Sequence, residues 1–426
     1  RQALGEPLLE SGPPLPARRP PPPPPLLHSD ADRREFVSAG AAAGIAAAFG
    51  APIGGVLFCL EEVATHWTRK VAWRCLAAAA AAVFTQTQLF PKWASGVLPF
   101  HGVAGLDAWD WLHQLPLLAA VAAGGGVLGA AFNHGHAALA ARTGAAASRS
   151  RSISARAATA GGVAAAIVTT MFALSITFGT CLDVPAWHDT GYGVALTCAA
   201  PLYNDLASLF FSAPTASISH LFSLGRLTPE AGVCRGEGCY FTLRSMAVLC
   251  PTYLAAMTLS SSLLVPGGLF MPALVVGGSA GGVAGVLLMR ALPAWGLQPG
   301  LFAMVAGTAV LGGVFRSSLS LVVLVVEGTQ SVKFLLGVLL AAVVSNFCGE
   351  RLHPGGVYES QLEHDGRVVY LRPTPPPALY TRTAGSVGAR AVWTFREVEA
   401  AAYVVDVLTR TGHNGFPVVA GTSDDK

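Results

Sequence analysis

Apolar stretches recur along the chain up to about residue 350, and several approach the ~20 residues that a membrane-spanning helix requires. Other stretches are shorter and are interrupted by glycine or proline. Short, interrupted segments are typical of discontinuous helices around a site at mid-membrane depth, since irregular backbone is tolerated there only inside protein or beside water. We predict helices at 33–47, 51–64, 71–90, 113–141, 155–179, 200–212, 241–263, 270–290, 300–312, 317–329 and 332–349.

Both ends of the chain differ from this apolar pattern. The first residues are rich in proline and predict a disordered or mispredicted segment, and because the chain begins with Arg1 we expect it to be truncated at its start. Near the other end, an amphipathic helix at 396–409 and a strand at 416–419 predict a soluble α/β module. The predicted segments are 1–30, a membrane domain at 31–362, a linker at 363–377 and the α/β module, which begins at 378 and is cut off at 426.

The composition fits a membrane protein, since 52% of the residues are hydrophobic and only 12% are charged. That balance argues against a soluble enzyme, and we expect no covalent chemistry. The formal net charge of +3 argues for no partner by itself. We therefore expect the chain to contact membrane lipid and no nucleic acid.

Basic residues gather at two of the predicted inter-helix turns and give an orientation. Positively charged loops face the cytosol, so both turns are predicted to be cytosolic. The loops at 91–112 and 180–199 would then be lumenal or extracellular. The basic residues are Arg69, Lys70 and Arg74 at the first turn, and Arg142, Arg149, Arg151 and Arg156 at the second.

The eight cysteines are scattered, and no C-x-x-C pair has the spacing of a metal site. Cys181 and Cys198 share one predicted loop, as do Cys234 and Cys239. A disulfide in a non-cytosolic loop stays open, but the sequence favours unpaired cysteines that act as small residues. We expect no metal.

The segment Gly268–Pro272 places a glycine, two backbone amides and a proline inside an apolar region, directly before a small-residue stretch at 273–288. This pattern predicts a helix that begins at membrane depth. A helix start presents unpaired N–H groups and the positive end of the helix dipole, which together favour a bare anion. The sequence therefore predicts an anion site at this helix start.

An internal repeat links two apolar segments without a gap. Residues 49–61 align on residues 315–327, and each segment starts at a phenylalanine and ends at a glutamate. Two such halves with an anion-facing helix start between them are the layout of an inverted-repeat transporter, although two apolar helices can also match by coincidence. Arg316 lies at the start of the second copy, and the sequence leaves open whether it contacts the pathway or snorkels to the surface.

Three glutamates follow these apolar helices. Carboxylates so close to the hydrocarbon region are candidates for function, and either Glu61 or Glu62 could carry a proton. Partial burial would raise the pKa of Glu62 and let it cycle between its charged and neutral forms near neutral pH. The alternative is a helix end that reaches cytosolic water beside Arg69 and Lys70, which we favour for Glu61, and we expect Glu327 to be structural.

These residues carry a family resemblance. Residues 41–62 resemble a helix pair of the CLC family of chloride channels and chloride/proton exchangers, and Gly268–Pro272 is similar to that family's Gly-x-Phe-x-Pro motif. The resemblance runs from about Arg33 to the end, and 33–40, 203–205 and 413–419 are similar to the endolysosomal and plant-vacuolar branch. It implies an all-α polytopic membrane protein with inverted repeats and discontinuous helices, lacking its first helices here, followed by a partial α/β CBS domain in the cytosol.

The resemblance also assigns roles to individual residues. It implies that chloride binds the backbone amides of Leu269 and Phe270, between Gly268 and Pro272, and that the hydroxyl of Tyr358 completes the site. Neutral donors of this kind bind an anion without holding it too tightly to leave. The resemblance implies that Glu62 is the internal proton-transfer glutamate. An interfacial aromatic anchor is the alternative for Tyr358.

Two family motifs are missing from this sequence. The first chloride motif, Gly-Ser-Gly-Ile-Pro, does not occur, and neither does an intact Gly-Lys-Glu-Gly-Pro, whose glutamate is the outer gate. Residues 4–12 resemble a damaged copy of the latter, which makes Glu6 a candidate gate remnant.

The resemblance implies voltage-dependent chloride transport, with chloride/proton antiport preferred, across an endosomal, lysosomal, vacuolar or Golgi membrane. A passive chloride channel and a non-transporting truncated or pseudogene product remain alternatives. The implied partners are a second copy of the chain and, as a further option, an accessory β subunit. No cofactor is required beyond chloride as bound ion. Nucleotide binding by the CBS region and chloride against nitrate selectivity stay open.

Overall fold

The computed structural model describes residues 30–64, 66–89, 112–149, 153–183, 193–199, 201–224, 241–263, 267–317, 319–329, 332–365, 382–387, 392–411 and 415–419. The chain forms two compact units, Arg1–Val368 and Val369–Lys426, which are described separately.

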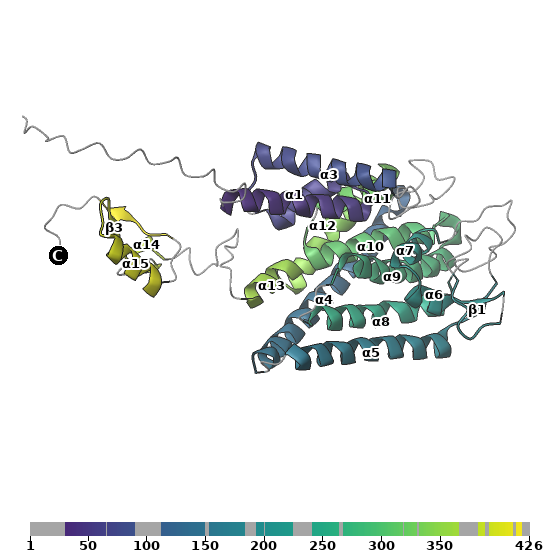
Figure 1. The fold of residues 1–426 in the computed structure, drawn as a ribbon. Helices are drawn as coiled ribbons and strands as arrows, with labels where there is room; N and C mark the ends of the chain where they lie inside the picture. The colour runs from purple at the N-terminus through teal and green to yellow at the C-terminus, as the bar shows by residue number, and fades with distance from the viewer. Residues whose placement is uncertain are drawn as a thin grey trace, which may run out of the picture. The chain divides into compact units, whose positions relative to one another are not determined.

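The first unit is a helical bundle (Figure 1). Its helices are α1 (Asp30–Phe49), α2 (Pro52–Phe58), the π-helical turn η1 (Cys59–Val63), α3 (Arg69–Leu89), η3 (Leu112–Gln114), α4 (Leu115–Arg149), α5 (Ile153–Phe178), α6 (Asp205–Phe211), α7 (Pro214–Phe222), α8 (Leu243–Ser261), α9 (Phe270–Ala291), η4 (Pro293–Trp295), α10 (Pro299–Phe315), α11 (Leu319–Thr329), η5 (Val332–Phe334), α12 (Leu335–Leu352) and α13 (Val357–Asp365), and its strands are β1 (Cys181–Leu182) and β2 (Tyr203–Asn204).

The centre of this bundle is α10, in which every residue is buried. A helix that is apolar on all sides has no face for solvent and belongs in a core. It packs against α4, α9 and α12. The close approach of α9 depends on Gly277, Gly281 and Gly285, where an added Cβ would collide with the backbone of α10.

Four segments are long and apolar enough to cross a membrane, by length and composition, within the part of the chain that the structure describes. They are Leu112–Arg142, Ser154–Phe178, Phe270–Ala291 and Val332–Leu362, and the shorter apolar helices are Pro299–Phe315 and Leu319–Thr329. The short α2 falls outside this set. Most predicted helices lie within a few residues of the observed ones, but the helix predicted from 200 begins at Asp205 and α7 was not predicted.

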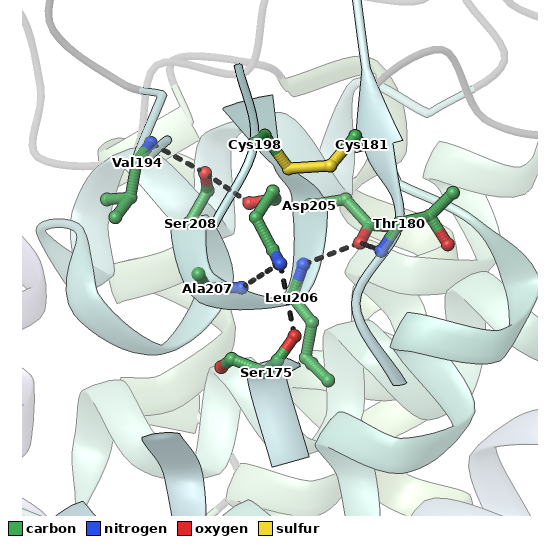
Figure 2. Close-up of a disulfide and its surroundings, with 10 residues drawn as sticks. Ser175, Thr180, Cys181, Val194, Cys198, Asp205, Leu206, Ala207 and Ser208 are labelled. Carbon is green, nitrogen blue, oxygen red and sulfur yellow. Dashed lines mark hydrogen bonds between the residues drawn. A yellow bond between two sulfur atoms is a disulfide. The ribbon is translucent and has the colours of Figure 1, made fainter. Parts of the chain in front are cut away.

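A disulfide joins Cys181 to Cys198 beside the antiparallel pair of β1 and β2, which corrects the expectation of unpaired cysteines (Figure 2). Asp205 organises the segment, because one carboxylate oxygen accepts hydrogen bonds from the amides of Thr180 (2.8 Å) and Leu206 (2.7 Å). The Thr180 contact ties the segment before Cys181 to the start of α6, and the amide of Asn204 donates to the carbonyl oxygen of Val194 (2.9 Å) in the segment that carries Cys198. A disulfide fits an oxidising compartment, which agrees with a lumenal or extracellular position for this loop. Cys234 and Cys239 lie outside the described residues.

The second unit contains α14 (Ala384–Val387), β3 (Phe395–Arg396), α15 (Ala401–Arg410) and β4 (Val418–Val419). The helix predicted at 396–409 starts later than expected, because Arg396 belongs to a strand that pairs in parallel with β4. A parallel pair needs a crossover connection, which α15 provides between the two strands. Phe395 packs against Tyr403 and Phe416 and so joins the helix to the strands.

Candidate functional site: an uncapped helix start and a half-buried carboxyl

The start of α9 is a helix N-terminus without a side-chain cap. Leu269 is the N-cap residue, and its side chain makes no capping hydrogen bond. The first helical backbone bond runs from the amide of Ala273 to the carbonyl oxygen of Leu269 (3.1 Å). Because Pro272 has no N–H, the donors left at this end are the amides of the residues before it. These amides are the donors that the sequence predicted for an anion.

Two glycines leave the approach to this helix start open. Gly267 and Gly268 are exposed, and a Cβ built on either would meet nothing within 4 Å. The predicted anion segment thus begins a helix as expected, with Phe270 as its first residue.

A chain of aromatic rings connects the start of α9 to Tyr358. The ring of Phe270 lies 4.3 Å from that of Phe49 and 6.3 Å from that of Phe315, measured between centroids. The ring of Tyr358 lies 5.3 Å from that of Phe315 and 6.4 Å from that of Phe58. The structure therefore brings two of the predicted site segments to the same aromatic cluster.

The glycines before Tyr358 allow this position. Gly355 has a φ of +83°, which a residue with a side chain rarely adopts. Gly356 packs against the end of α10, where an added Cβ would lie 2.5 Å from the carbonyl oxygen of Phe315. The Gly-Gly pair turns the chain tightly enough to place Tyr358 against Phe315.

Glu61 and Glu62 lie on the π-helical turn η1, which continues α2. The carboxylate of Glu61 accepts hydrogen bonds from the amides of Leu319 (3.1 Å) and Ser320 (2.9 Å) and from the hydroxyls of Ser317 and Ser320. Burial raises its pKa, but these hydrogen bonds outweigh burial and hold the pKa of Glu61 below its ordinary value. Glu61 is exposed, as expected for a helix end that reaches water, but its carboxylate caps α11, and Lys70 pairs with Glu35.

Glu62 occupies a different environment from Glu61, although the two are adjacent. Its turn is not part of the four segments that are long and apolar enough to cross a membrane. Burial first, then the negative charges of Glu61 and Glu359, raise the pKa of Glu62 from 4.5 to about 7, against a smaller opposing contribution from Ser317. A carboxyl with a pKa near neutrality can both take up and release a proton at physiological pH.

Glu327 repeats the contact of Glu61 in the opposite direction. Its carboxylate accepts hydrogen bonds from the amides of Gly54 (2.7 Å) and Ile53 (3.3 Å), at the start of α2. The end of each helix therefore caps the start of the other, so α2 and α11 are antiparallel. This agrees with the structural role expected for Glu327.

Backbone geometry follows the same internal repeat. Gly50 and Arg316, which the ungapped alignment pairs, both adopt left-handed conformations, with φ of +62° and +65°. The phenylalanines that precede them, Phe49 and Phe315, both contact Phe270. The start of α9 thus lies between the two copies of the repeat.

Sequence reasoning missed part of this site. The hydroxyls of Ser317 and Ser320 and the bracketing of Phe270 were not predicted, although the ungapped repeat was a signal for them. Arg316 is held inside the unit, since its guanidinium donates to the carbonyl oxygens of Asn346 (3.3 Å) and His353 (2.9 Å). Glu6 lies outside the described residues, and the described residues contain no cluster of three metal-ligating side chains.

Comparison with known proteins identifies the family. Residues 22–350 match the family model of the voltage gated chloride channel. The chain is 32% identical to the mouse "H(+)/Cl(-) exchange transporter 7", covering 93% of this chain and 48% of that protein. It is 29% identical to the "Chloride channel protein CLC-d" of Arabidopsis thaliana, covering 93% of this chain and 51% of that protein. The chain thus spans about half the length of these curated relatives.

Solved structures show the same fold. A crystal structure of a eukaryotic CLC transporter matches with a TM-score of 0.55 at 20% identity, over 93% of this chain and 59% of that one. A slow cyanobacterial Cl-/H+ antiporter matches with a TM-score of 0.50 at 15% identity, over 79% of this chain and 66% of that one. Together with the family model, these matches establish that the chain is a member of the voltage-gated chloride channel family, with that family's helical membrane fold.

Proposed function

We propose that this protein exchanges chloride for protons across an intracellular membrane. The observation that carries the proposal is the uncapped start of α9, joined through aromatic rings to Tyr358, with the half-buried carboxyl of Glu62 near that tyrosine. Chloride would bind the backbone amides of Leu269 and Phe270 and the hydroxyl of Tyr358. Donors without a full charge suit an ion that must also leave.

Glu62 would carry the proton. Its raised pKa allows it to be protonated and deprotonated near neutral pH. Chloride is too weak a base to carry the proton. The mouse relative is named an exchange transporter, which supports antiport over passive conduction. The Arabidopsis relative is named a channel, so a passive chloride channel is the second candidate.

The remaining proposals concern the rest of the protein. We assign the second unit to the start of a cytosolic CBS domain, supported by its β3, α15 and β4 order, and leave adenine nucleotide as its candidate ligand. A homodimer is supported by large exposed apolar side chains on α3 and α12, among them Trp73 and Phe347. The endosomal, lysosomal, vacuolar or Golgi membrane is the proposed location, supported by the resemblance of residues 33–40, 203–205 and 413–419 to the endolysosomal and plant-vacuolar branch of the family.

Reconstitution of the full chain into liposomes tests antiport. An outward chloride gradient should drive protons inward in the wild type. We expect Glu62→Gln to abolish that proton movement, because the amide neither takes up nor releases a proton near neutral pH, while chloride flux persists. Glu350→Gln, which changes an exposed carboxylate on α12, serves as the control and should retain coupling. Chloride flux in the wild type without proton movement would favour the passive channel.

A further inference from the structure

We propose that Glu61 is a positioning residue for Glu62: the hydrogen bonds that tie Glu61 to the start of α11 fix the π-helical turn, and its charge stays beside the Glu62 carboxyl. This inference rests on the proposed function, in which Glu62 transfers the proton. It assigns a task to a residue that the sequence left to solvent.

The first step of the argument is the turn itself. The helix of Pro52–Phe58 is only 7 residues long, and the chain then widens into the π-helical turn that carries both glutamates. The turn closes with a bond from the amide of Ala64 to the carbonyl oxygen of Cys59 (2.9 Å). Isolated π-helical turns are rare and occur mostly at functional sites. Because the helix before this turn is short, we expect a contact from another segment to stabilise the turn.

Glu61 supplies that contact from the opposite copy of the repeat. Two amides and two hydroxyls at the start of α11 converge on its carboxylate, and the hydroxyls of Ser317 and Ser320 lie 2.6 Å apart. A carboxylate bound by several donors at a helix N-terminus stays ionised and keeps one orientation. The carboxylate of Glu61 therefore fixes the backbone directly before Glu62.

The second step is where Glu62 then faces. The titratable groups that face it are Glu61 on its own turn and, on α13, Tyr358 and Glu359. Tyr358 is also the proposed chloride ligand. A rotation of the turn would therefore change the distance between the proton carrier and the anion site.

The mirror contact provides a built-in control. Glu327 caps α2 in the same way, but the residue after it is Gly328, which has no side chain to position. At the mirror positions of Ser317 and Ser320 stand Ala51 and Gly54, so the second contact also lacks the two hydroxyls. Glu61→Gln and Glu327→Gln should each weaken the same kind of helix cap. Only Glu61→Gln should also change the environment of the Glu62 carboxyl.

The experiment titrates the Glu62 carboxyl by difference infrared spectroscopy in the full chain, with Glu62→Gln subtracted. In Glu61→Gln we expect the titration of Glu62 to move toward acid by about one pH unit, because a neighbouring negative charge has been removed. In Glu327→Gln the titration should not move. An unchanged titration in Glu61→Gln, or an equal shift in both variants, would overturn the proposal.

A second variant separates position from charge. Ser320→Ala retains the charge of Glu61 and removes one hydroxyl donor to it, while Ser317, which also acts on Glu62, stays in place. We expect proton flux to fall about tenfold relative to chloride flux, since a displaced proton carrier transfers poorly. An unchanged flux ratio would sink the positioning role. If the wild type moves no protons at all, antiport fails, but the infrared titration still decides whether Glu61 sets the environment of Glu62.

Discussion

The two copies of the internal repeat share one construction and differ in what surrounds it. Each copy runs from a phenylalanine that touches Phe270, through a left-handed residue, to a glutamate that caps the opposite helix. The shared parts build a symmetric frame around the start of α9. The differences show which copy has been adapted for a titratable group.

One difference lies at the left-handed position. The first copy has Gly50, which adopts a positive φ at no steric cost. The second has Arg316, which adopts the same positive φ at a steric cost because it has a Cβ. The guanidinium of Arg316 compensates through its bonds to the carbonyl oxygens of Asn346 and His353, near the end of α12. The second copy thus accepts backbone strain and gains a link to its neighbouring helix.

The other difference lies at the glutamate. Glu327 is followed by two more α-helical residues, whereas the chain after Glu61 continues the π-helical turn with Glu62. Serine hydroxyls strengthen only the contact of Glu61. The same capping contact therefore stabilises a helix in one copy and lies next to the half-buried carboxyl of Glu62 in the other.

The largest effect is expected where the two copies touch. A Cβ added at Gly54 would lie 2.9 Å from the Cα of Leu324, so α2 and α11 could no longer approach. We expect Gly54→Ala to lower the free energy of unfolding by about 3 kcal/mol, the upper part of the range for overpacking. Denaturant titration of the full chain in detergent micelles measures it.

The matched control is Gly44→Ala in the interior of α1, where an added Cβ meets nothing within 4 Å. This change should stabilise the chain by about 0.5–1 kcal/mol, because alanine favours a helix more than glycine does. Equal effects at the two glycines would mean that contact between the repeat copies does not limit stability.

A smaller effect should appear in the pH dependence of stability. The folded chain raises the pKa of Glu62 from 4.5 to about 7, mainly through burial, so the folded state binds this proton more tightly than the unfolded state does. The resulting stabilisation is fully present below pH 4.5 and is lost as the pH rises through 7. The full shift corresponds to about 3 kcal/mol, and because the carboxyl is only half-buried and partly screened by water, we expect a loss of about 2 kcal/mol across this window.

The wild type should therefore lose stability over that pH range relative to Glu62→Gln, as measured by denaturant titration at several pH values. Glu327→Gln should keep the wild-type slope, because its neighbour Gly328 does not titrate. A slope that survives in Glu62→Gln would assign the pH dependence to another group.

Much of this fold could be predicted from local pattern. Apolar length placed most helices, and the ungapped repeat aligned the two segments in which Gly50 and Arg316 share a left-handed conformation. Glycine and proline at 268–272 located the helix start of α9. These features depend on residues close together in the chain, which is why periodicity and motif spacing could find them.

The contacts that define the site were harder to predict because they join distant segments. The carboxylate of Glu61 meets Ser320 259 residues later, and local sequence gives no reason for it to avoid Arg69. The Cys181–Cys198 disulfide likewise depends on the pairing of two-residue strands, which are too short for a periodic signal. Side-chain contact across a repeat requires the packed structure.

The smallest effect tests the left-handed positions themselves. If both copies impose the same backbone conformation, alanine should be less stable than glycine by about 1 kcal/mol at either position, because a Cβ is disfavoured at positive φ. At the first position the comparison is Gly50→Ala with the wild type, and at the second it is Arg316→Ala with Arg316→Gly. The second comparison cancels the lost guanidinium bonds, since both variants lack them. Thermal unfolding in detergent gives the two differences, and a glycine preference at position 50 alone would show that the mirrored φ angles do not carry equal strain.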